Sequence, residues 1–86
     1  MTKIDQLINS LDDKITSLFI ELFAEADEQI NIKSWQDRFK LVSTGTRDSM
    51  NIPETWTITF EDMHSPYAHF NLHMNGQEPD DFSIDT

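Results

Sequence analysis

The feature that most constrains the fold is one apolar stripe in the first third of the chain. Over residues 3–28 apolar side chains recur at steps of three and four, and no Gly or Pro interrupts them. That spacing places them on one face of an α-helix. The stripe is wider than a two-stranded coiled-coil seam, so we expect it to be buried in the protein's own core, with a homodimer interface as the alternative. It comprises Ile4, Leu7, Ile8, Leu11, Ile15, Leu18, Phe19, Leu22, Phe23 and Ala26.

Alternating segments in the second half of the chain predict a sheet that covers this helix. Apolar and polar residues alternate over 55–62 and 67–74, the period of strands with one buried face. Residues 81–85 form a third short strand with Phe82 and Ile84 inward. Pro79 has no backbone N–H to donate, which places that strand at an edge of the sheet.

Residues 34–42 allow two interpretations, helix or strand. Ser34 and Asp37 have the spacing of a helix cap, whereas the alternation over 38–44 favours a strand that ends near Gly45. We favour the strand, followed by a loop over 46–55. The 86 residues are then a single α+β domain. One long N-terminal amphipathic helix (about 3–28) packs on a three- or four-stranded antiparallel meander of strands 38–44, 55–62, 67–74 and 81–85.

Matching of buried faces predicts the strand register. Opposed residues of antiparallel strands share a face, so we expect Phe60 opposite Ala68, with a five-residue loop between their strands. The last pairing brings Phe82 opposite Phe70. That pairing requires a three-residue loop or a bulge at Gly76, because a simple two-residue turn would put Phe82 on the wrong face.

The polar side chains then collect on the open face of the sheet. We interpret this face as a surface that binds a basic protein, because carboxylates bind Arg bidentately and Tyr adds contact area. An ordinary solvated sheet face is the alternative interpretation. The register places Tyr67 near Glu61 and Asp85, and Asn71 near Asp81. The candidate partner-binding residues are Glu61, Tyr67, His69, Asn71, His73, Asp80, Asp81 and Asp85.

The charge of the chain is large and uneven. The net charge is −10, and residues 48–86 carry eight acids and no Lys or Arg. Such a chain repels nucleic acid and anionic membranes and is attracted to basic partners; plain solubility is the alternative explanation. The one basic cluster is expected to neutralise acids of the helix or the sheet. It comprises Lys33, Arg38, Lys40 and Arg47.

The sequence gives little support to metal or catalytic chemistry. His69 and His73 are four residues apart, a zinc spacing on a helix, but on a strand they lie about 13 Å apart. Neighbouring acids such as Asp80 and Asp81 point to opposite faces of a strand and make no dyad. With no Cys and only two Gly, the chain offers neither a thiolate nor a glycine-rich phosphate loop. We therefore expect no enzyme, no metal and no cofactor.

The N-terminal segment has no targeting character. Asp5, Asp12 and Asp13 interrupt what a signal peptide would need as an apolar run. No stretch approaches the ~18 apolar residues of a membrane span. We expect a cytoplasmic protein without a membrane partner.

The whole profile, a short, Cys-free, acidic α+β chain without a catalytic constellation, resembles bacterial immunity proteins that neutralise nuclease toxins. It is also similar to phage-encoded anti-restriction and anti-CRISPR inhibitors, which mimic nucleic acid. The resemblance, carried by size and charge, implies a toxin inhibitor that binds a basic protein and makes no direct contact with nucleic acid. We expect a monomer or weak homodimer. Two alternatives are a regulatory module that oligomerises through its helix and a small enzyme with a pocket near its His residues.

Overall fold

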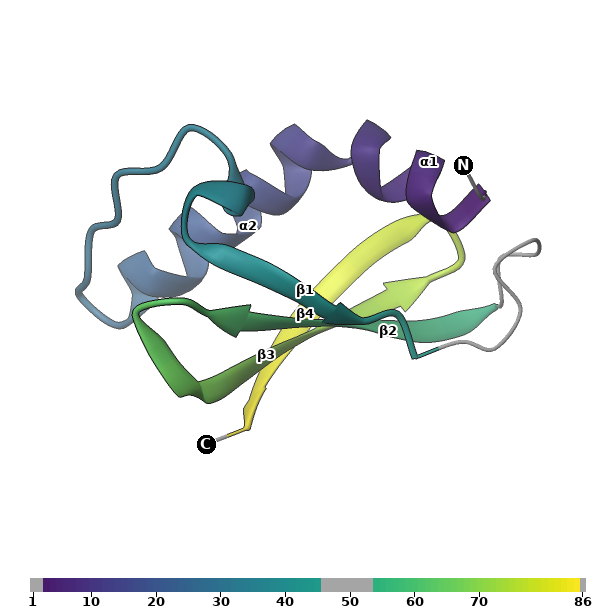
Figure 1. Ribbon diagram of the computed structural model, residues 1–86. Coiled ribbons are helices and arrows are strands. Elements are labelled where there is room, and N and C mark those ends of the chain that lie inside the picture. The colour runs from purple at the N-terminus through teal and green to yellow at the C-terminus, as the bar shows by residue number, and fades with distance from the viewer. Residues whose placement is uncertain (1–2, 46–53, 86) are drawn as a thin grey trace.

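The computed structural model describes residues 3–45 and 54–85 as two layers, with the helices on one face of a sheet (Figure 1). The strands lie in the order β1-β2-β3-β4 and all neighbours are antiparallel. The α+β meander is confirmed, with four strands. Most of the predicted loop 46–55, including Arg47, lies outside the described residues. The elements are α1 (Lys3–Ser10), α2 (Asp12–Glu25), the 3₁₀ turn η1 (Trp35–Asp37), β1 (Phe39–Ser43), β2 (Thr55–Asp62), β3 (Ser65–Asn75) and β4 (Glu78–Asp85).

The helical layer is interrupted at Leu11, so the prediction of one continuous helix is wrong. The Ser10 hydroxyl donates to the Leu7 carbonyl at 2.7 Å, the same oxygen that accepts the Leu11 N–H at 3.0 Å. Side-chain bonds of this kind bend helices. The apolar stripe nevertheless continues across the interruption, because buried residues of both helices pack into one core: Ile4, Ile8, Ile15, Phe19 and Phe23.

Helix α2 ends at Glu25, earlier than predicted. The Glu28 N–H donates to the Phe23 carbonyl at 2.9 Å and the Asp27 N–H to the Ala24 carbonyl at 3.0 Å. Asp27 has φ 60°. This is the Schellman arrangement, in which a residue in the left-handed region follows the helix. The position is usually Gly, so the sequence carried no signal for the stop.

Residues 34–43 realise both interpretations in succession. The Ser34 hydroxyl accepts the Gln36 N–H at 3.3 Å, and the Asp37 carboxylate accepts the N–H groups of Ser34 at 3.1 Å and Lys33 at 2.9 Å. This capping box begins η1. The two backbone donors, first Ser34 and then Lys33, hold the pKa of Asp37 below its ordinary value of 3.8. Strand β1 then begins at Phe39.

The β2–β3 register is shifted by two residues from the prediction. Phe60 lies opposite Phe70 rather than Ala68, because the turn contains only Met63 and His64 and a bulge follows Glu61. An even shift leaves every side chain on its predicted face. The apolar side of the sheet therefore packs under the helices as expected.

The β3–β4 pair contains the bulge that face matching requires. The turn itself has two residues, Gly76 and Gln77, and Phe82 lies opposite Leu72 rather than Phe70. The register shifts between Leu72 and Met74, so two β4 residues, Asp80 and Asp81, oppose the single His73. β4 is an edge strand, as Pro79 indicated.

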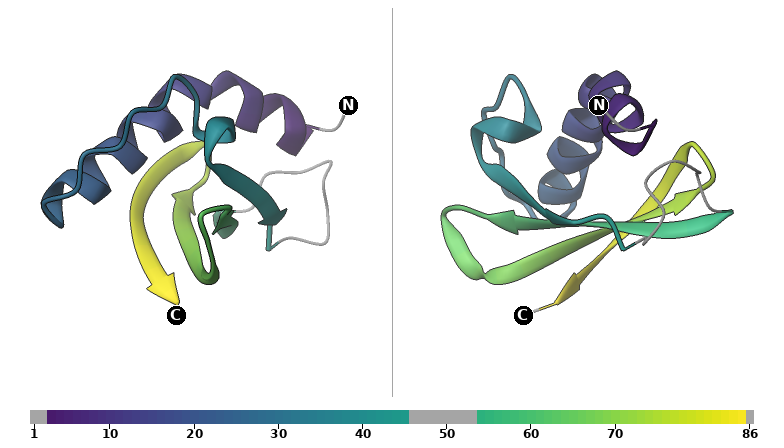
Figure 2. Two further views of the ribbon diagram at one scale, coloured as in Figure 1. Left: turned by 60° about the vertical axis from the view of Figure 1, so that its left-hand side comes forward. Right: turned by 45° about the vertical axis from the view of Figure 1, so that its right-hand side comes forward.

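Aromatic packing joins the two layers around one α2 side chain. The Phe19 ring stacks on Phe39 with centroids 3.8 Å apart. It meets Phe60 and Phe70 edge-on at 5.2 and 5.8 Å. This core fixes the helices over one face of the sheet, and no described helix covers the other face (Figure 2). No helix of the described residues is long and apolar enough to span a membrane.

Candidate partner-binding surface

The open face of the sheet carries a row of linked polar side chains. The Thr59 hydroxyl donates to the Asn71 carbonyl oxygen at 2.9 Å, and the Asn71 amide donates to the Asp85 carboxylate at 3.3 Å. A second link joins His73 Nε2 to the Ser83 hydroxyl at 2.9 Å. These bonds run across β2, β3 and β4, so the strands hold the polar groups in fixed positions.

The two-residue register shift changes the neighbours on this face. His69, rather than Tyr67, lies opposite both Glu61 and Asp85. The predictions that Tyr67 adjoins those acids and that Asn71 adjoins Asp81 are therefore wrong, and Asn71 lies opposite Ser83. Tyr67 is 87% exposed. The pairing places five candidate residues on the central face, whereas Tyr67 lies in the irregular stretch of β3 between Ser65 and His69. The five are Glu61, His69, Asn71, His73 and Asp85.

Asp80 and Asp81 lie at the β4 bulge, apart from that central face. Both line a groove of about 250 Å³ between β4 and α2. Asp80 also lines a hollow beside His73. Both residues lie at the bulge opposite His73, where the alternation of the strand is interrupted. These two carboxylates connect the open face with the edge of the molecule.

Lys40 is a cation on the open face that the candidate list missed. It lies on β1 directly opposite Glu61 and is exposed. The strand predicted over 38–44 already contained the signal, because an inward Phe39 places Lys40 outward. The face is therefore mixed in charge at its β1 side and acidic at its β4 side.

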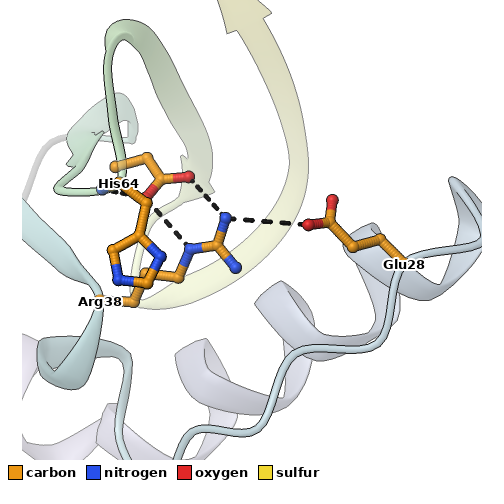
Figure 3. A network of polar contacts seen from close by, with 4 residues as sticks. Glu28, Arg38 and His64 are labelled. Atoms are coloured by element: carbon orange, nitrogen blue, oxygen red, sulfur yellow. Dashed lines mark hydrogen bonds and ion pairs between the residues drawn. The ribbon is translucent and has the colours of Figure 1, made fainter.

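A buried ion pair at the β1 corner was also missed. Arg38 donates from Nε and Nη2 to the two Asp62 carboxylate oxygens at 3.1 and 3.0 Å, and Nη2 lies 3.9 Å from Glu28 (Figure 3). The Asp62 side chain is 3% exposed, and it also accepts the His64 N–H at 2.9 Å. The hydrogen bond to Asp62 raises the pKa of Arg38 above its ordinary value. Arg38 thus neutralises a sheet acid, as expected for the basic cluster.

Catalytic and metal chemistry have limited support in the described residues. Over 3–45 and 54–85 no group of three His, Asp or Glu could hold a metal ion, and His69 and His73 lie on one strand as predicted. A hollow of about 500 Å³ adjoins His73, and Ser83 is within nucleophile–base distance of its ring. Among the described residues, however, no carboxylate bonds that ring to orient it.

Comparison with known protein families, with curated proteins and with solved structures gives no match to this chain. The chemistry of the surface is therefore what bears on function. Fixed polar groups on the open face continue into carboxylates at the β4 edge, and the strand Glu78–Asp85 contains no Lys or Arg. A surface of this kind attracts cationic groups.

Proposed function

We propose that this protein binds and inhibits a basic, nucleic-acid-processing protein, most simply a nuclease-type toxin that it neutralises as an immunity protein would. The observation that supports the proposal is the one-sided charge. Residues 48–86 carry eight acids without a Lys or Arg, and Asp80, Asp81 and Asp85 lie together on the edge strand. Two described cations are already paired, Arg38 with the buried Asp62 and Lys14 with Glu78.

Binding by this surface follows from three properties of its side chains. Carboxylates such as Asp85 accept Arg in bidentate pairs. The hydrogen bonds that hold Asn71 and Asp85 reduce the ordering cost of association. The exposed ring of Tyr67 supplies contact area with a polar tip.

Binding inhibits the partner because the partner uses the same positive charge to bind its substrate. A nuclease binds phosphates through Lys and Arg, and an acidic protein on that surface excludes the substrate. The net charge of −10 also speeds the encounter by electrostatic attraction. A phage-encoded anti-restriction or anti-CRISPR inhibitor would use the same surface against a different target, and it is the second candidate.

The regulatory module that oligomerises through its helix has less support. Its apolar stripe packs on the sheet, where Ile15 and Phe19 are fully buried. The small-enzyme alternative rests on two features of the described residues, the His73–Ser83 pair and the hollow beside His73.

Capture of the partner from the source cell's lysate tests the proposal, run at about 0.1 and 0.5 M salt, where exposed charges are screened differently. We expect one dominant basic protein, weakened at the higher salt. It should be lost with the triple variant Glu61→Gln, Asp81→Asn and Asp85→Asn.

A matched triple variant, Asp13→Asn, Asp27→Asn and Glu54→Gln, removes the same charge from outside this surface and should retain the partner. The captured protein is then assayed on nucleic acid with and without the acidic chain. Equal capture by both triple variants contradicts the assigned surface, and full activity of the partner in the complex contradicts inhibition.

A further inference from the structure

The groove between α2 and β4 has a composition suited to one kind of ligand. Its floor is formed by half-buried apolar side chains of both elements, and carboxylates stand on both sides of it, two from α2 and two from β4. Ile84 faces the same side of β4 as Phe82 and is 51% exposed, so apolar surface continues along the strand. The lining residues are Leu18, Glu21, Leu22, Glu25, Asp80, Asp81 and Phe82.

The strand beside this groove has a free edge. β4 pairs with β3 on one side only, so its outer backbone N–H and C=O groups have no strand partner within the described residues. Beyond the bulge its pairing is regular, from Phe82 opposite Leu72 to Asp85 opposite His69. The C-terminal part of β4 diverges from α2 (Figure 2), so the edge is accessible where it is most regular.

We propose that this groove binds an extended basic segment of the partner, which adds to β4 as a further strand. Strand addition takes its affinity from backbone hydrogen bonds and its specificity from alternate side chains. The side chains on the α2 side would be Lys or Arg, with their aliphatic stems packed on Phe82 and Ile84 and their charged ends at the carboxylates of α2. The alternate side chains would face the open side of the sheet. The inference rests on the proposed function, because the segment belongs to the same basic partner.

Charge selects this occupant over the two others that an edge strand invites. A second copy of this chain would bring Glu21, Glu25, Asp80 and Asp81 against the same four acids. Nucleic acid would meet the same repulsion. Lys14, one helical turn before Leu18, does not neutralise the groove, because it is paired with Glu78 at 3.0 Å.

A synthetic heptapeptide of alternating Arg and Val, acetylated and amidated, is the probe. Binding is followed by amide chemical shifts and by hydrogen-exchange protection of the isotope-labelled protein. We expect shifts along residues 82–85 and 18–25, with new protection of β4 amides. A matched peptide with Pro in place of the central Val cannot complete the strand and should bind about tenfold more weakly, a loss of about one or two hydrogen bonds.

The variant that tests the groove is Glu21→Gln with Glu25→Gln, and its matched control is Asp13→Asn with Asp27→Asn. The groove variant should weaken peptide binding about three- to tenfold, the scale of two exposed ion pairs, and the control should not. Equal effects of the two variants, equal affinity of the Pro peptide, or shifts confined to the open face around His69 would each overturn the proposal. So would self-association of the protein through β4 without peptide.

The groove and the inhibitor function can fail separately. If the captured partner binds the Glu21→Gln, Glu25→Gln variant as tightly as the wild-type chain, the groove assignment is wrong while the inhibitor function stands. If the peptide binds as expected but the lysate yields no basic partner, the groove assignment stands as a peptide site and the inhibitor function falls.

Discussion

The two edges of the sheet are protected against unwanted strand pairing in different ways. The β1 edge is short and tightly packed, with Phe39 stacked on Phe19 and Arg38 paired to the buried Asp62. The β4 edge spans Glu78–Asp85 and relies on Pro79, a bulge and acidic side chains, which are known devices of edge protection. A short strand offers few backbone groups to any partner, whereas negative charge disfavours all partners except basic ones. The comparison indicates that β1 is a structural edge and β4 is available for recognition.

Each edge also has its own ion pair, and the two pairs differ in burial. The side chains of Arg38 and Asp62 are 15% and 3% exposed, whereas those of Lys14 and Glu78 are 52% and 74% exposed. The Arg38 guanidinium also lies 4.8 Å from the centre of the Phe23 ring. Removing one partner destabilises the fold far more when the ion pair is buried than when it is exposed.

The largest expected effect is therefore at the β1 corner. Arg38→Met leaves the Asp62 carboxylate buried without its cation, and we expect the free energy of unfolding to fall by about 3–5 kcal/mol. Lys14→Met should cost less than about 1 kcal/mol, because the exposed pair is screened by water. Urea denaturation measures both.

A second variant separates loss of the charge pair from loss of packing. Adding Asp62→Asn to Arg38→Met removes the unpaired charge and keeps an acceptor for the His64 N–H, so part of the stability should return. Equal losses for Arg38→Met and Lys14→Met would contradict the difference drawn between the two edges.

The next largest effect is expected from substituting a glycine, and it should differ between the glycine after β1 and the glycine before β4. Gly45 and Gly76 have nearly the same φ, +63° and +62°, so each Ala substitution should cost about 1 kcal/mol in backbone strain. A Cβ on Gly45 would also lie 2.8 Å from the Thr57 carbonyl oxygen, whereas a Cβ on Gly76 meets nothing. We expect a total of about 2–4 kcal/mol for Gly45→Ala, measured by urea denaturation.

Asn substitutions at the same glycines isolate the contact. Asn tolerates the left-handed region, so Gly76→Asn should be close to neutral while Gly45→Asn keeps the close approach to Thr57. Similar losses at both positions would mean that the β1 end is no more tightly packed than the β4 turn.

The sequence predicted the fold class and the sheet faces because alternation reports directly on burial. It could not predict the β2–β3 register, because an even shift leaves every face unchanged and the Met63–His64 turn has no glycine signature. The helix interruption depends on one side-chain bond from Ser10. The end of α2 depends on Asp27 in a position that usually holds Gly.

The same limits apply to the candidate surface. Period-two spacing was sufficient to place His69, Asn71 and His73 on the open face. The Arg38–Asp62 pair joins residues 24 apart in sequence, which no local pattern reveals. Asp80 and Asp81 line the groove at the bulge opposite His73, and the position of that bulge follows from the pairing of whole strands.

A third variant removes part of the negative charge that distinguishes β4. The variant Asp80→Asn, Asp81→Asn and Asp85→Asn removes the repulsion between two β4 edges, and Ile84 is 51% exposed beside them. We expect a light-scattering mass that rises with protein concentration, whereas the wild-type mass stays constant. Adding Ile84→Thr should reduce the association. A concentration-independent mass for the variant would show that Pro79 and the bulge are sufficient to protect this edge.

The smallest expected effect is a loss of stability at low pH, and it should again differ between the β1 and β4 sides of the sheet. Asp37 caps the turn that leads into β1, and its pKa lies below the ordinary 3.8 because the N–H groups of Ser34 and Lys33 bind the carboxylate. Because the pKa of Asp37 is lower in the folded state, its ionised carboxylate stabilises the fold above about pH 4. This stabilisation is lost as the pH falls through the folded-state pKa. Asp37→Asn should therefore lower the urea midpoint slightly at pH 7, and the difference from wild type should vanish once the pH falls below the lowered folded-state pKa. The wild-type amides of 35–43 should likewise lose more hydrogen-exchange protection in acid than those of 82–85. A constant difference between the two proteins down to the lowest pH would mean that the cap acts through the Asp37 shape and not through its charge.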